Sequence, residues 1–305
     1  MQAGRHGRPP SAFVSVSETA ARQQMSVMTN LPCPDAVLTV SVVSHGDDVG
    51  MLPRTLESLA RAAEFSGPVR QGMRLVLVDN GPEDAARSAA LAAVVRRWQG
   101  AVAVISGQGN VGYGRGHNLA IQRGDSTYHL VLNPDVEIAP NALAEAVAFL
   151  EEHPACGLLA PAVRDGHGEL QYLCKRRPTV LDLLLRGFAP GRVRERFRAR
   201  LDRYEMRDLI NDRDIVWDPP IVSGCFMLFR AEVLKALGGF DARYFLYFED
   251  FDLSLRTARV ARVAYVPAVR IVHHGGGAAR KGFAHVRMFV ASAAKFFGRH
   301  GWRWA

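Results

Sequence analysis

Apolar segments alternate with helical patterns through the first half of the chain. Four short, nearly continuous apolar segments have the character of buried strands: residues 37–44, 73–78, 101–106 and 128–132. Three segments with apolar residues at helical spacing separate them: residues 52–63, 83–98 and 116–123. Because strands that alternate with helices build parallel sheets, this order predicts an α/β fold with a mostly parallel central sheet flanked by helices.

Polar or glycine-rich residues follow each predicted strand. They are His45 to Asp48, Asp79-Asn80, Gly107 to Gly116 and Asn133-Pro134-Asp135. A single polar loop after a strand is ordinary, but in sheets of this kind the ligand lies at the carboxyl ends of the strands. Four such loops in register therefore predict a binding site at that edge.

One of these loops matches a dinucleotide-binding motif. Three glycines fit GxGxxG between a predicted strand and a predicted helix: Gly107, Gly109 and Gly112. Two strand-helix units precede them, however, and the loop continues through Gly114 and Gly116 to His117-Asn118. A long glycine loop favours close approach to a sugar nucleotide, so a dehydrogenase is the minor alternative.

Three carboxylates lie in an aromatic and apolar run between Ser223 and Arg256: Glu249, Asp250 and Asp252. A carboxylate in such surroundings is costly unless it is paired, metal-bound or reactive. Two adjacent carboxylates also raise the pKa of one of them, which suits a general base. Each acid alone can also be explained as a helix cap. A later strand-like segment ends at His273-His274, a second group of candidate site residues.

Size and charge narrow the classes of protein. A chain of 305 residues with 48% hydrophobic content can form one large α/β domain or two smaller ones. The net charge of +8 indicates anionic partners, but without a recognition module we expect no nucleic acid. Four scattered cysteines without a CxxC pair favour a reducing cytoplasm. Residues 1–34 lack the apolar core of a secretion signal and are predicted to be a disordered extension.

The second half contains a basic segment, residues 175–214, with eleven arginines interrupted by Leu181 to Leu185, Phe188 and Phe197. Such a stretch can lie on an anionic membrane, while a solvated helical insertion explains it equally well. Residues 286–305 repeat the mixture of basic and aromatic residues and are predicted to form an amphipathic helix and tail. No apolar run reaches about 18 residues, so any membrane contact would be peripheral.

In combination and order, these motifs resemble the family 2 glycosyltransferases with the GT-A fold, in particular rhamnosyltransferase-like members. The resemblance covers Val37 to about Gly298 through the segments VSVVSHGDD, LVLVDNG, GNVGYGRGHNLAI, LVLNPDVEI, GELQYLCKRRPT, SGCFMLFRAEVLKALGGFDARYFLYFEDFDLSLR and VRIVHHGGG. It implies a Rossmann-like nucleotide-binding domain with a donor half at 35–160 and an acceptor and catalytic half at 161–285.

The resemblance implies donor contacts from the strand ends and the glycine loop: Ser44, Asp79, Asn80, Gly112, Gly114, His117, Asn118, Asn133 and Asp135. Asp135 matches the last acid of the family's DxD motif, and His273 matches its late histidine. Both are thus the implied ligands of Mg²⁺ or Mn²⁺. Asn133 replaces the first acid of the motif, which bears on the strength of metal binding. That acid often contacts ribose hydroxyls, so its loss is compatible with a deoxyribose donor such as dTDP.

Asp250 matches the family's catalytic base, which takes a proton from the acceptor hydroxyl during an inverting attack, and Glu249 would orient the acceptor. Acceptor contacts are implied for Gln171, Ser223, Gly224 and Cys225. The implied reaction transfers L-rhamnose from dTDP-β-L-rhamnose to a polyprenyl-diphosphate-linked or cell-envelope saccharide, at the inner face of the plasma membrane. Two alternatives stay open: a UDP- or GDP-sugar donor, and a catalytically idle nucleotide-sugar-binding scaffold.

Overall fold

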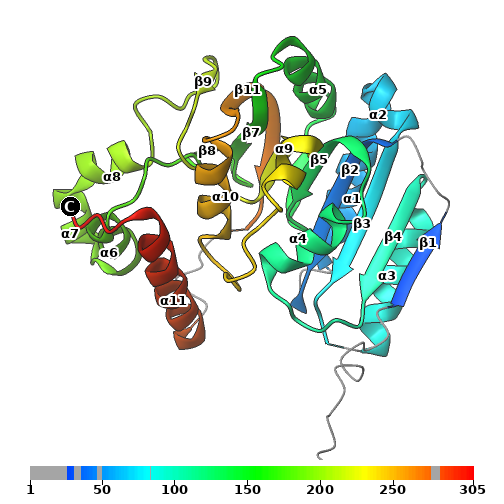
Figure 1. Cartoon of the computed structure of the whole chain (residues 1–305), viewed down its shortest axis with the longest axis horizontal. Coiled ribbons are helices and arrows are strands. Elements are labelled where there is room, and N and C mark those ends of the chain that lie inside the picture. The colour runs from blue at the N-terminus through cyan, green and yellow to red at the C-terminus, as the bar shows by residue number, and fades with distance from the viewer. Residues whose placement is uncertain (1–25, 31–35, 47–49, 83, 276–281) are drawn as a thin grey trace, which may run out of the picture.

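A mixed β-sheet runs through the whole molecule. The computed structural model describes residues 26–30, 36–46, 50–82, 84–275 and 282–305. The strand order is β1-β4-β3-β2-β5-β10-β7-β11-β6 (Figure 1). Its first half is built from four parallel strands: β2 (Ala36–Ser44), β3 (Met73–Asp79), β4 (Ala101–Ser106) and β5 (Ser126–Leu132). The predicted parallel sheet is thus confirmed where the apolar segments indicated it.

The second half of the chain extends the same sheet. Strand β10 (Phe226–Arg230) pairs antiparallel with β5 and with β7 (Cys156–Arg164). Strand β11 (Arg262–His273) runs parallel to β7 and antiparallel to β6 (Val136–Ile138). The short strands β8 (Leu170–Gln171) and β9 (Val216–Trp217) pair with β7 and β11. The predicted boundary at residue 160 falls inside β7, so the two predicted halves share one sheet.

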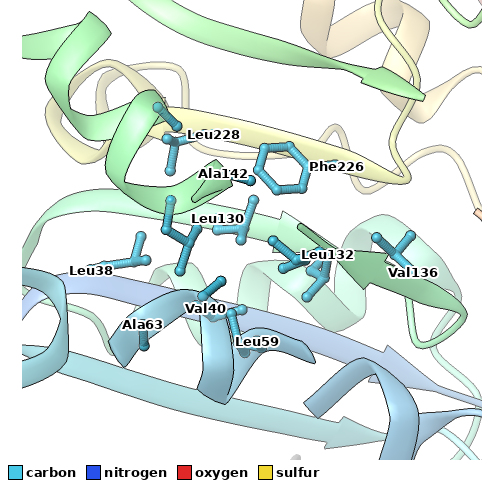
Figure 2. Close-up of a cluster of buried hydrophobic side chains, with 14 of the residues drawn as sticks. Leu38, Val40, Leu59, Ala63, Leu130, Leu132, Val136, Ala142, Phe226 and Leu228 are labelled. Atoms are coloured by element: carbon cyan, nitrogen blue, oxygen red, sulfur yellow. The ribbon is translucent and has the colours of Figure 1, made fainter. Parts of the chain in front are cut away.

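Helices cover both faces of the sheet because the strand residues alternate between two apolar clusters. Leu130 and Leu132 of β5 pack toward α1 (Leu52–Phe65) and α5 (Ala142–Glu152), as Figure 2 shows. Val131 faces the other cluster, which contains residues of α4 (Tyr113–Ile121), α9 (Ala231–Ala236) and α10 (Glu249–Thr257). The remaining helices on the donor half are α2 (Gly67–Gln71) and α3 (Ala85–Arg97).

Helix α4 begins three residues earlier than the pattern predicted. It starts at Tyr113, directly after Gly112, whose φ of +87° is a conformation that favours glycine. Gly114 and Gly116 lie inside the helix rather than before it. A Cβ at Gly114 would be 2.8 Å from Phe240 Cβ, and one at Gly116 would be 2.8 Å from Val43 Cγ2. These glycines therefore serve close packing rather than an extended loop.

The expectation of a disordered N-terminal extension is wrong for five residues. Strand β1 (Ser26–Asn30) pairs antiparallel with β4 at the edge of the sheet. The backbone N–H and C=O groups of an edge strand can pair with another segment regardless of that segment's side chains. This pairing therefore needs no apolar pattern in the sequence, and none was there to predict it. Residues 1–25 and 31–34 of the predicted extension lie outside the described residues, as do Asp47, Asp48 and Glu83.

The basic segment is helical and gathers at one end of the molecule. It contains α6 (Val180–Phe188), α7 (Gly191–Arg196) and α8 (Arg198–Tyr204). The C-terminal helix α11 (Phe283–His300) lies next to them (Figure 1). Among the described residues, no helix combines the length and apolar character needed to cross a membrane.

Candidate active site

Arg87 of α3 ties the ends of β2 and β3 together. Its Nε donates to Asp79 Oδ1 at 2.6 Å, and its Nη2 donates to Ser44 Oγ at 3.0 Å. All three residues are buried, and Gly81 leaves room for the guanidinium, since a Cβ there would clash with it. The structure thus brings Ser44 and Asp79 together as the sequence indicated. Arg87 was missed because it lies in the next helix with no motif around it.

The glycine loop is fastened to the end of β3. Asn80 Nδ2 donates to Gly112 O at 3.0 Å, and Gln108 Nε2 donates to Asp79 O at 2.7 Å. Gly112 lies so close to Phe245 O that a Cβ would clash with it. Asn80 and Gly112 therefore belong to one hydrogen-bonded unit at the carboxyl edge of the sheet.

Two of the residues predicted to contact the donor point into the protein instead. His117 is completely buried, with Nδ1 2.8 Å from Ser41 Oγ, and burial, with His129 nearby, lowers its pKa well below the ordinary value. Asn118 exchanges two hydrogen bonds with the backbone of Phe240, at 2.7 and 2.8 Å. Because α4 starts at Tyr113, its inner face turns these side chains toward the core, where they hold the helix in place.

Asp135 directly precedes β6 and His273 ends β11, and the antiparallel pairing of these two strands brings the residues side by side. His273 Nε2 lies 3.5 Å from Asp135 Oδ1, and that buried oxygen has no hydrogen-bond partner among the described residues. Burial opposes ionisation of Asp135, but His273, a backbone N–H and Asn133 together outweigh it, and the pKa of Asp135 is lowered. His274 turns the other way, 2.8 Å from Glu137 Oε1, as expected for adjacent residues at a strand end.

This pair fits one side of a divalent metal site. The carboxylate oxygen of Asp135, unpaired among the described residues, and the imidazole nitrogen of His273 face the same space. Gly275 keeps this space open, because a Cβ at that position would clash with Asp135 Oδ2 and lie 2.8 Å from His273 Nε2. Carboxylate oxygen and imidazole nitrogen are both ligands of Mn²⁺-type ions. In the described part of the chain, no group of three or more such side chains is placed to hold a metal, so other ligands must complete the coordination.

The predicted catalytic acids begin α10 after a strained turn. Tyr247 and Phe248 both have positive φ, +70° and +66°, which costs a non-glycine residue about 1–3 kcal/mol. Asp250 Oδ2 accepts from Gly224 N at 3.0 Å, and Oδ1 accepts from Phe251 N at 2.9 Å. Strain of this kind is typical of functional sites, and here it directs the first two residues of the helix.

Glu249 and Asp250 lie in different electrostatic environments. Burial, and then the charge of Asp250, raise the pKa of Glu249 to about 8, and Glu249 Oε2 has no partner in the described residues. Burial also raises the pKa of Asp250, but the N–H groups of Gly224 and Phe251 oppose that rise. The pair therefore holds its shared proton on Glu249 and its negative charge on Asp250.

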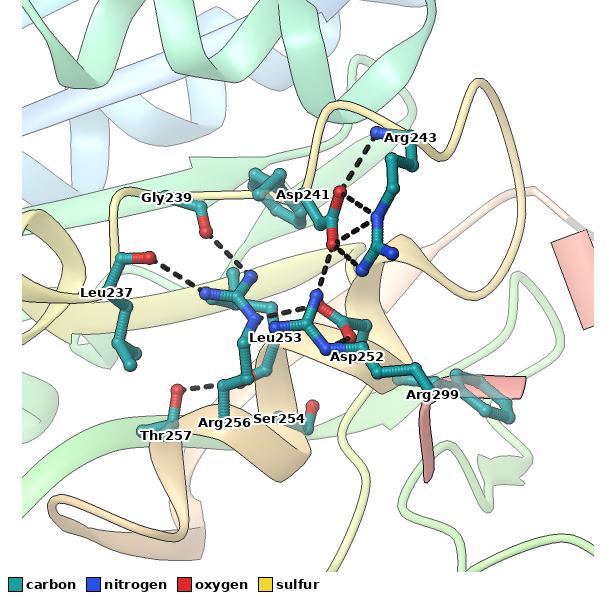
Figure 3. A network of polar contacts seen from close by, with 12 residues as sticks. Leu237, Gly239, Asp241, Arg243, Asp252, Leu253, Ser254, Arg256, Thr257 and Arg299 are labelled. Atoms are coloured by element: carbon teal, nitrogen blue, oxygen red, sulfur yellow. Dashed lines mark hydrogen bonds and ion pairs between the residues drawn. The ribbon is translucent and has the colours of Figure 1, made fainter. Parts of the chain in front are cut away.

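The third acid, Asp252, is structural. It is fully buried, accepts from Arg256 Nε at 2.7 Å and lies 2.8 Å from His300 Nε2 of α11. Figure 3 shows this network, in which Arg256 also donates to the carbonyl groups of Leu237 and Gly239. Asp252 thus anchors α10 to the C-terminal helix.

Three of the four residues predicted to bind the acceptor line a cavity that is too small for a sugar. Gln171, Ser223 and Cys225 border a space of about 10 Å³, room for one water molecule at most. Gln171 Nε2 donates to His273 O at 3.3 Å. Burial raises the pKa of Cys225 to about 12, so its thiol stays protonated and is no nucleophile.

A much larger groove of about 980 Å³ opens at Glu249 and Asp250. Its other walls come from the arginine-rich helices and α11, and they combine charged with apolar side chains: Leu183, Arg186, Phe188, Arg194, Arg198, Tyr204, Glu205, Arg207, His285 and Phe289. The volume suits a ligand of sugar size or larger. The sequence did not reveal this groove, because its walls are formed by segments that are distant along the chain.

Comparisons with known proteins identify relatives of the chain. Residues 39–238 match the family described as Glycosyl transferase family 2. The N-acetylglucosaminyl-diphospho-decaprenol L-rhamnosyltransferase of Mycobacterium tuberculosis is 29% identical over 239 residues, which are 73% of this chain and 71% of that protein. Rhamnosyltransferase WbbL of Escherichia coli is 25% identical over 269 residues, 85% of this chain and 92% of the relative.

Solved structures share the fold at low sequence identity. The mannosyltransferase PcManGT of Pyrobaculum calidifontis, in complex with GDP-Man and Mn²⁺, has a TM-score of 0.57 at 17% identity, covering 87% of this chain and 65% of that one. GalNAc-T7 with UDP, GalNAc and Mn²⁺ has a TM-score of 0.59 at 16% identity, covering 86% of this chain and 48% of that one. The fold is that of the GT-A glycosyltransferases, as the motifs implied.

Proposed function

Because the chain belongs to glycosyl transferase family 2 and is a glycosyltransferase, we propose that it transfers L-rhamnose with inversion from dTDP-β-L-rhamnose. The acceptor in this proposal is a polyprenyl-diphosphate-linked or cell-envelope saccharide. The names of the relatives support this sugar and this class of acceptor. Family membership argues against a dehydrogenase and against an idle scaffold.

The observation that carries the proposal is the junction at Gly224-Cys225. Gly224 N donates to Asp250 Oδ2 at 3.0 Å, while Cys225 O accepts from Asn133 N at 2.9 Å, two residues before Asp135. The charges of both Asp135 and Asp250 raise the pKa of the Cys225 thiol, after burial. The candidate metal and diphosphate residues and the candidate base therefore lie on either side of one short backbone segment.

In the proposed reaction, Asp250 accepts the proton of an acceptor hydroxyl. The acceptor oxygen forms a bond to the anomeric carbon of the donor from the face opposite the nucleoside diphosphate, which leaves with the electron pair of the broken bond. Glu249, held neutral, donates a hydrogen bond that orients the acceptor. When bound at Asp135 and His273, Mg²⁺ or Mn²⁺ would disperse the charge of the leaving diphosphate. Ser44, Asp79, Asn80 and Gly112 would contact the nucleotide.

We place the acceptor in the large groove rather than at the small cavity. The groove joins Glu249 and Asp250 to Arg186, Arg194 and Arg198. In this arrangement the hydroxyl that reacts lies at the acids, while the anionic part of a lipid-linked acceptor lies among the arginines. Gln171, Ser223 and Cys225 then support the floor between the two substrates.

We also propose peripheral contact with an anionic membrane. Four apolar side chains of α6, α7 and the turn after them are 39–52% exposed, and four arginines are interspersed with them: Leu184, Phe188, Val193 and Phe197, with Arg192, Arg194, Arg196 and Arg198. Val180 N and Leu181 N donate to Arg303 O and Trp304 O, which brings the exposed Trp302 and Trp304 beside α6. Exposed aromatic and basic groups on one surface are typical of interfacial binding.

The donor is tested by binding and turnover of dTDP-rhamnose, UDP-glucose, UDP-galactose and GDP-mannose, with and without Mn²⁺ or Mg²⁺. We expect metal-dependent binding of dTDP-rhamnose that is lost in Asp135→Ala. Binding of another nucleotide sugar would overturn the donor but keep the reaction class. Failure of all four to bind would contradict the proposal as a whole.

The membrane contact is tested with vesicles that contain anionic lipid. We expect the triple variant Arg194→Glu, Arg196→Glu, Arg198→Glu to bind them about 100-fold more weakly, since three basic residues at about 1 kcal/mol each contribute about 3 kcal/mol. The control reverses two arginines elsewhere, Arg96 and Arg97, which are exposed on α3 at the far end of the molecule (Figure 1). Equal binding by the triple variant and the control would refute the assignment.

A further inference from the structure

Gly224 connects three parts of the site through its two backbone polar groups. Its N–H donates to Asp250 Oδ2 at 3.0 Å, and its carbonyl accepts from Tyr113 Oη at 2.6 Å. A Cβ at Gly224 would lie 3.3 Å from Asp250 Cβ and 3.4 Å from Tyr113 Cε1, so both side chains pack closely against this residue. The N–H and the carbonyl belong to the two peptide groups on either side of the Gly224 Cα, so the backbone of this one residue links the Tyr113 hydroxyl to the Asp250 carboxylate.

Tyr113 itself is held by the glycine loop. It is the first residue of α4, and its N–H donates to Phe245 O at 3.1 Å. The preceding carbonyl, Gly112 O, accepts from Asn80 Nδ2 at 3.0 Å. The ring of Tyr113 packs edge-on against His117, with 4.5 Å between ring centroids. A continuous series of contacts thus leads from Asn80 through Gly112, Tyr113 and Gly224 to Asp250.

We propose that Tyr113 is a positioning residue that fixes the backbone of Gly224 through its carbonyl, so that the N–H of the same residue points at Asp250, and that it thereby couples the glycine loop to the base. The inference rests on the proposed role of Asp250. Burial, with Glu249, Cys225, Asp250 and Asp135 adding to it, raises the pKa of Tyr113 well above its ordinary value. The hydroxyl therefore keeps its proton and acts as a donor throughout the working range of pH.

This arrangement has a consequence that packing alone would not have. The Gly224 N–H bond stabilises the ionised form of Asp250 against burial. Without the Tyr113 hydroxyl, the Gly224 carbonyl loses its partner, the φ and ψ of this glycine are less constrained, and the hydrogen bond from its N–H to Asp250 weakens. The pKa of Asp250 then rises further, because a hydrogen bond to the charged form of the acid has been lost.

The test is Tyr113→Phe, which removes the hydroxyl and keeps the ring. We expect kcat to fall about tenfold, the value of one hydrogen bond, with the KM of the donor unchanged. The acidic limb of the kcat–pH profile should move to higher pH. A titration followed by ¹³C NMR of labelled aspartate carboxyls, assigned with Asp250→Asn, should show a raised pKa for Asp250.

The matched control is Tyr244→Phe, because the Tyr244 hydroxyl is buried but has no hydrogen-bond partner among the described residues. It should change neither kcat nor the titration of Asp250. An Asp250 pKa that is the same in Tyr113→Phe as in the wild type would overturn the inference, even if kcat fell. The NMR titration needs no substrate, so it still decides the matter if every proposed donor fails.

Discussion

Replacing Asp250 by asparagine removes the proposed proton acceptor and leaves its surroundings nearly intact. The carboxylate accepts two backbone hydrogen bonds, from Gly224 N at 3.0 Å and Phe251 N at 2.9 Å. The single oxygen of asparagine can keep one of them. We therefore expect the free energy of unfolding to fall by only about 1 kcal/mol, the net value of one hydrogen bond.

The effect on turnover should be much larger. General-base assistance is worth about 10²- to 10⁴-fold, which corresponds to about 3–5 kcal/mol of activation free energy. We expect kcat of Asp250→Asn to fall within that range, while donor affinity, which depends on residues on the other side of Gly224-Cys225, stays the same. Release of the nucleoside diphosphate under saturating substrates measures kcat, and calorimetry with the donor measures affinity.

The matched control is Glu249→Gln. Burial and the neighbouring Asp250 raise the pKa of Glu249 to about 8, so this side chain is mostly neutral at pH 7 and glutamine resembles it in charge and shape. We expect a loss of less than about tenfold, the scale of one hydrogen bond. The assignment of the base is refuted if Asp250→Asn keeps more than about a tenth of the activity, or if Glu249→Gln loses as much as Asp250→Asn.

Three further predictions concern the surroundings of the acids and the metal pair. Asp252→Ala leaves the buried Arg256 and His300 without their acid, so the free energy of unfolding measured in urea should fall by about 3–5 kcal/mol. As a control, Asp208→Ala breaks the exposed ion pair with Arg176 and should lower it by less than about 1 kcal/mol. Equal losses in the two variants would contradict this prediction. The pKa of Glu249 is higher in the folded protein, about 8, than its ordinary value of 4.5, so the folded state binds more protons between these values and stability should fall as pH rises from 4.5 to 8. Urea titrations should show a weaker fall in Glu249→Gln, and an unchanged slope would count against the burial of that acid. Gly275→Ala places a Cβ against Asp135 and His273 and should weaken Mn²⁺ binding by about 10- to 100-fold. Gly298→Ala, whose Cβ would meet no atom of the described residues within 4 Å, should leave it unchanged, and equal affinity in both variants would refute the metal pair.

The four parallel strands of the first half, the order of the helices between them and the approximate position of the site could be read from the sequence. Apolar segments with strand or helix periodicity marked the parallel half of the sheet, because periodicity is a local property that survives folding. The acids at strand ends were also predictable, since parallel strands bring their carboxyl ends to one edge. The proximity of Asp135 and His273 could not be read in this way, because it depends on the antiparallel pairing of β6 with β11, which places Val136, the residue after Asp135, opposite His273.

Several site residues were decided only by contacts between distant segments. Arg87 reaches Ser44 across 43 positions of the chain, and Tyr113 reaches Gly224 across 111. His117 and Asn118 belong to a motif that suggested donor binding, yet the early start of α4 turns them into the core. Local patterns contain no information about which face of a short glycine-rich helix meets a sheet.

The sequence by itself thus determined the fold class and the acids available for chemistry, because apolar periodicity and residue type are written along the chain. The tertiary structure decided which acid is held ionised, which glycine leaves room for a ligand, and where a groove lies. Those properties depend on burial, hydrogen-bond partners and walls from segments far apart in sequence. A carboxylate such as Asp252 and one such as Asp250 look alike in the sequence, and only their different partners in the folded protein distinguish an anchor from a candidate base.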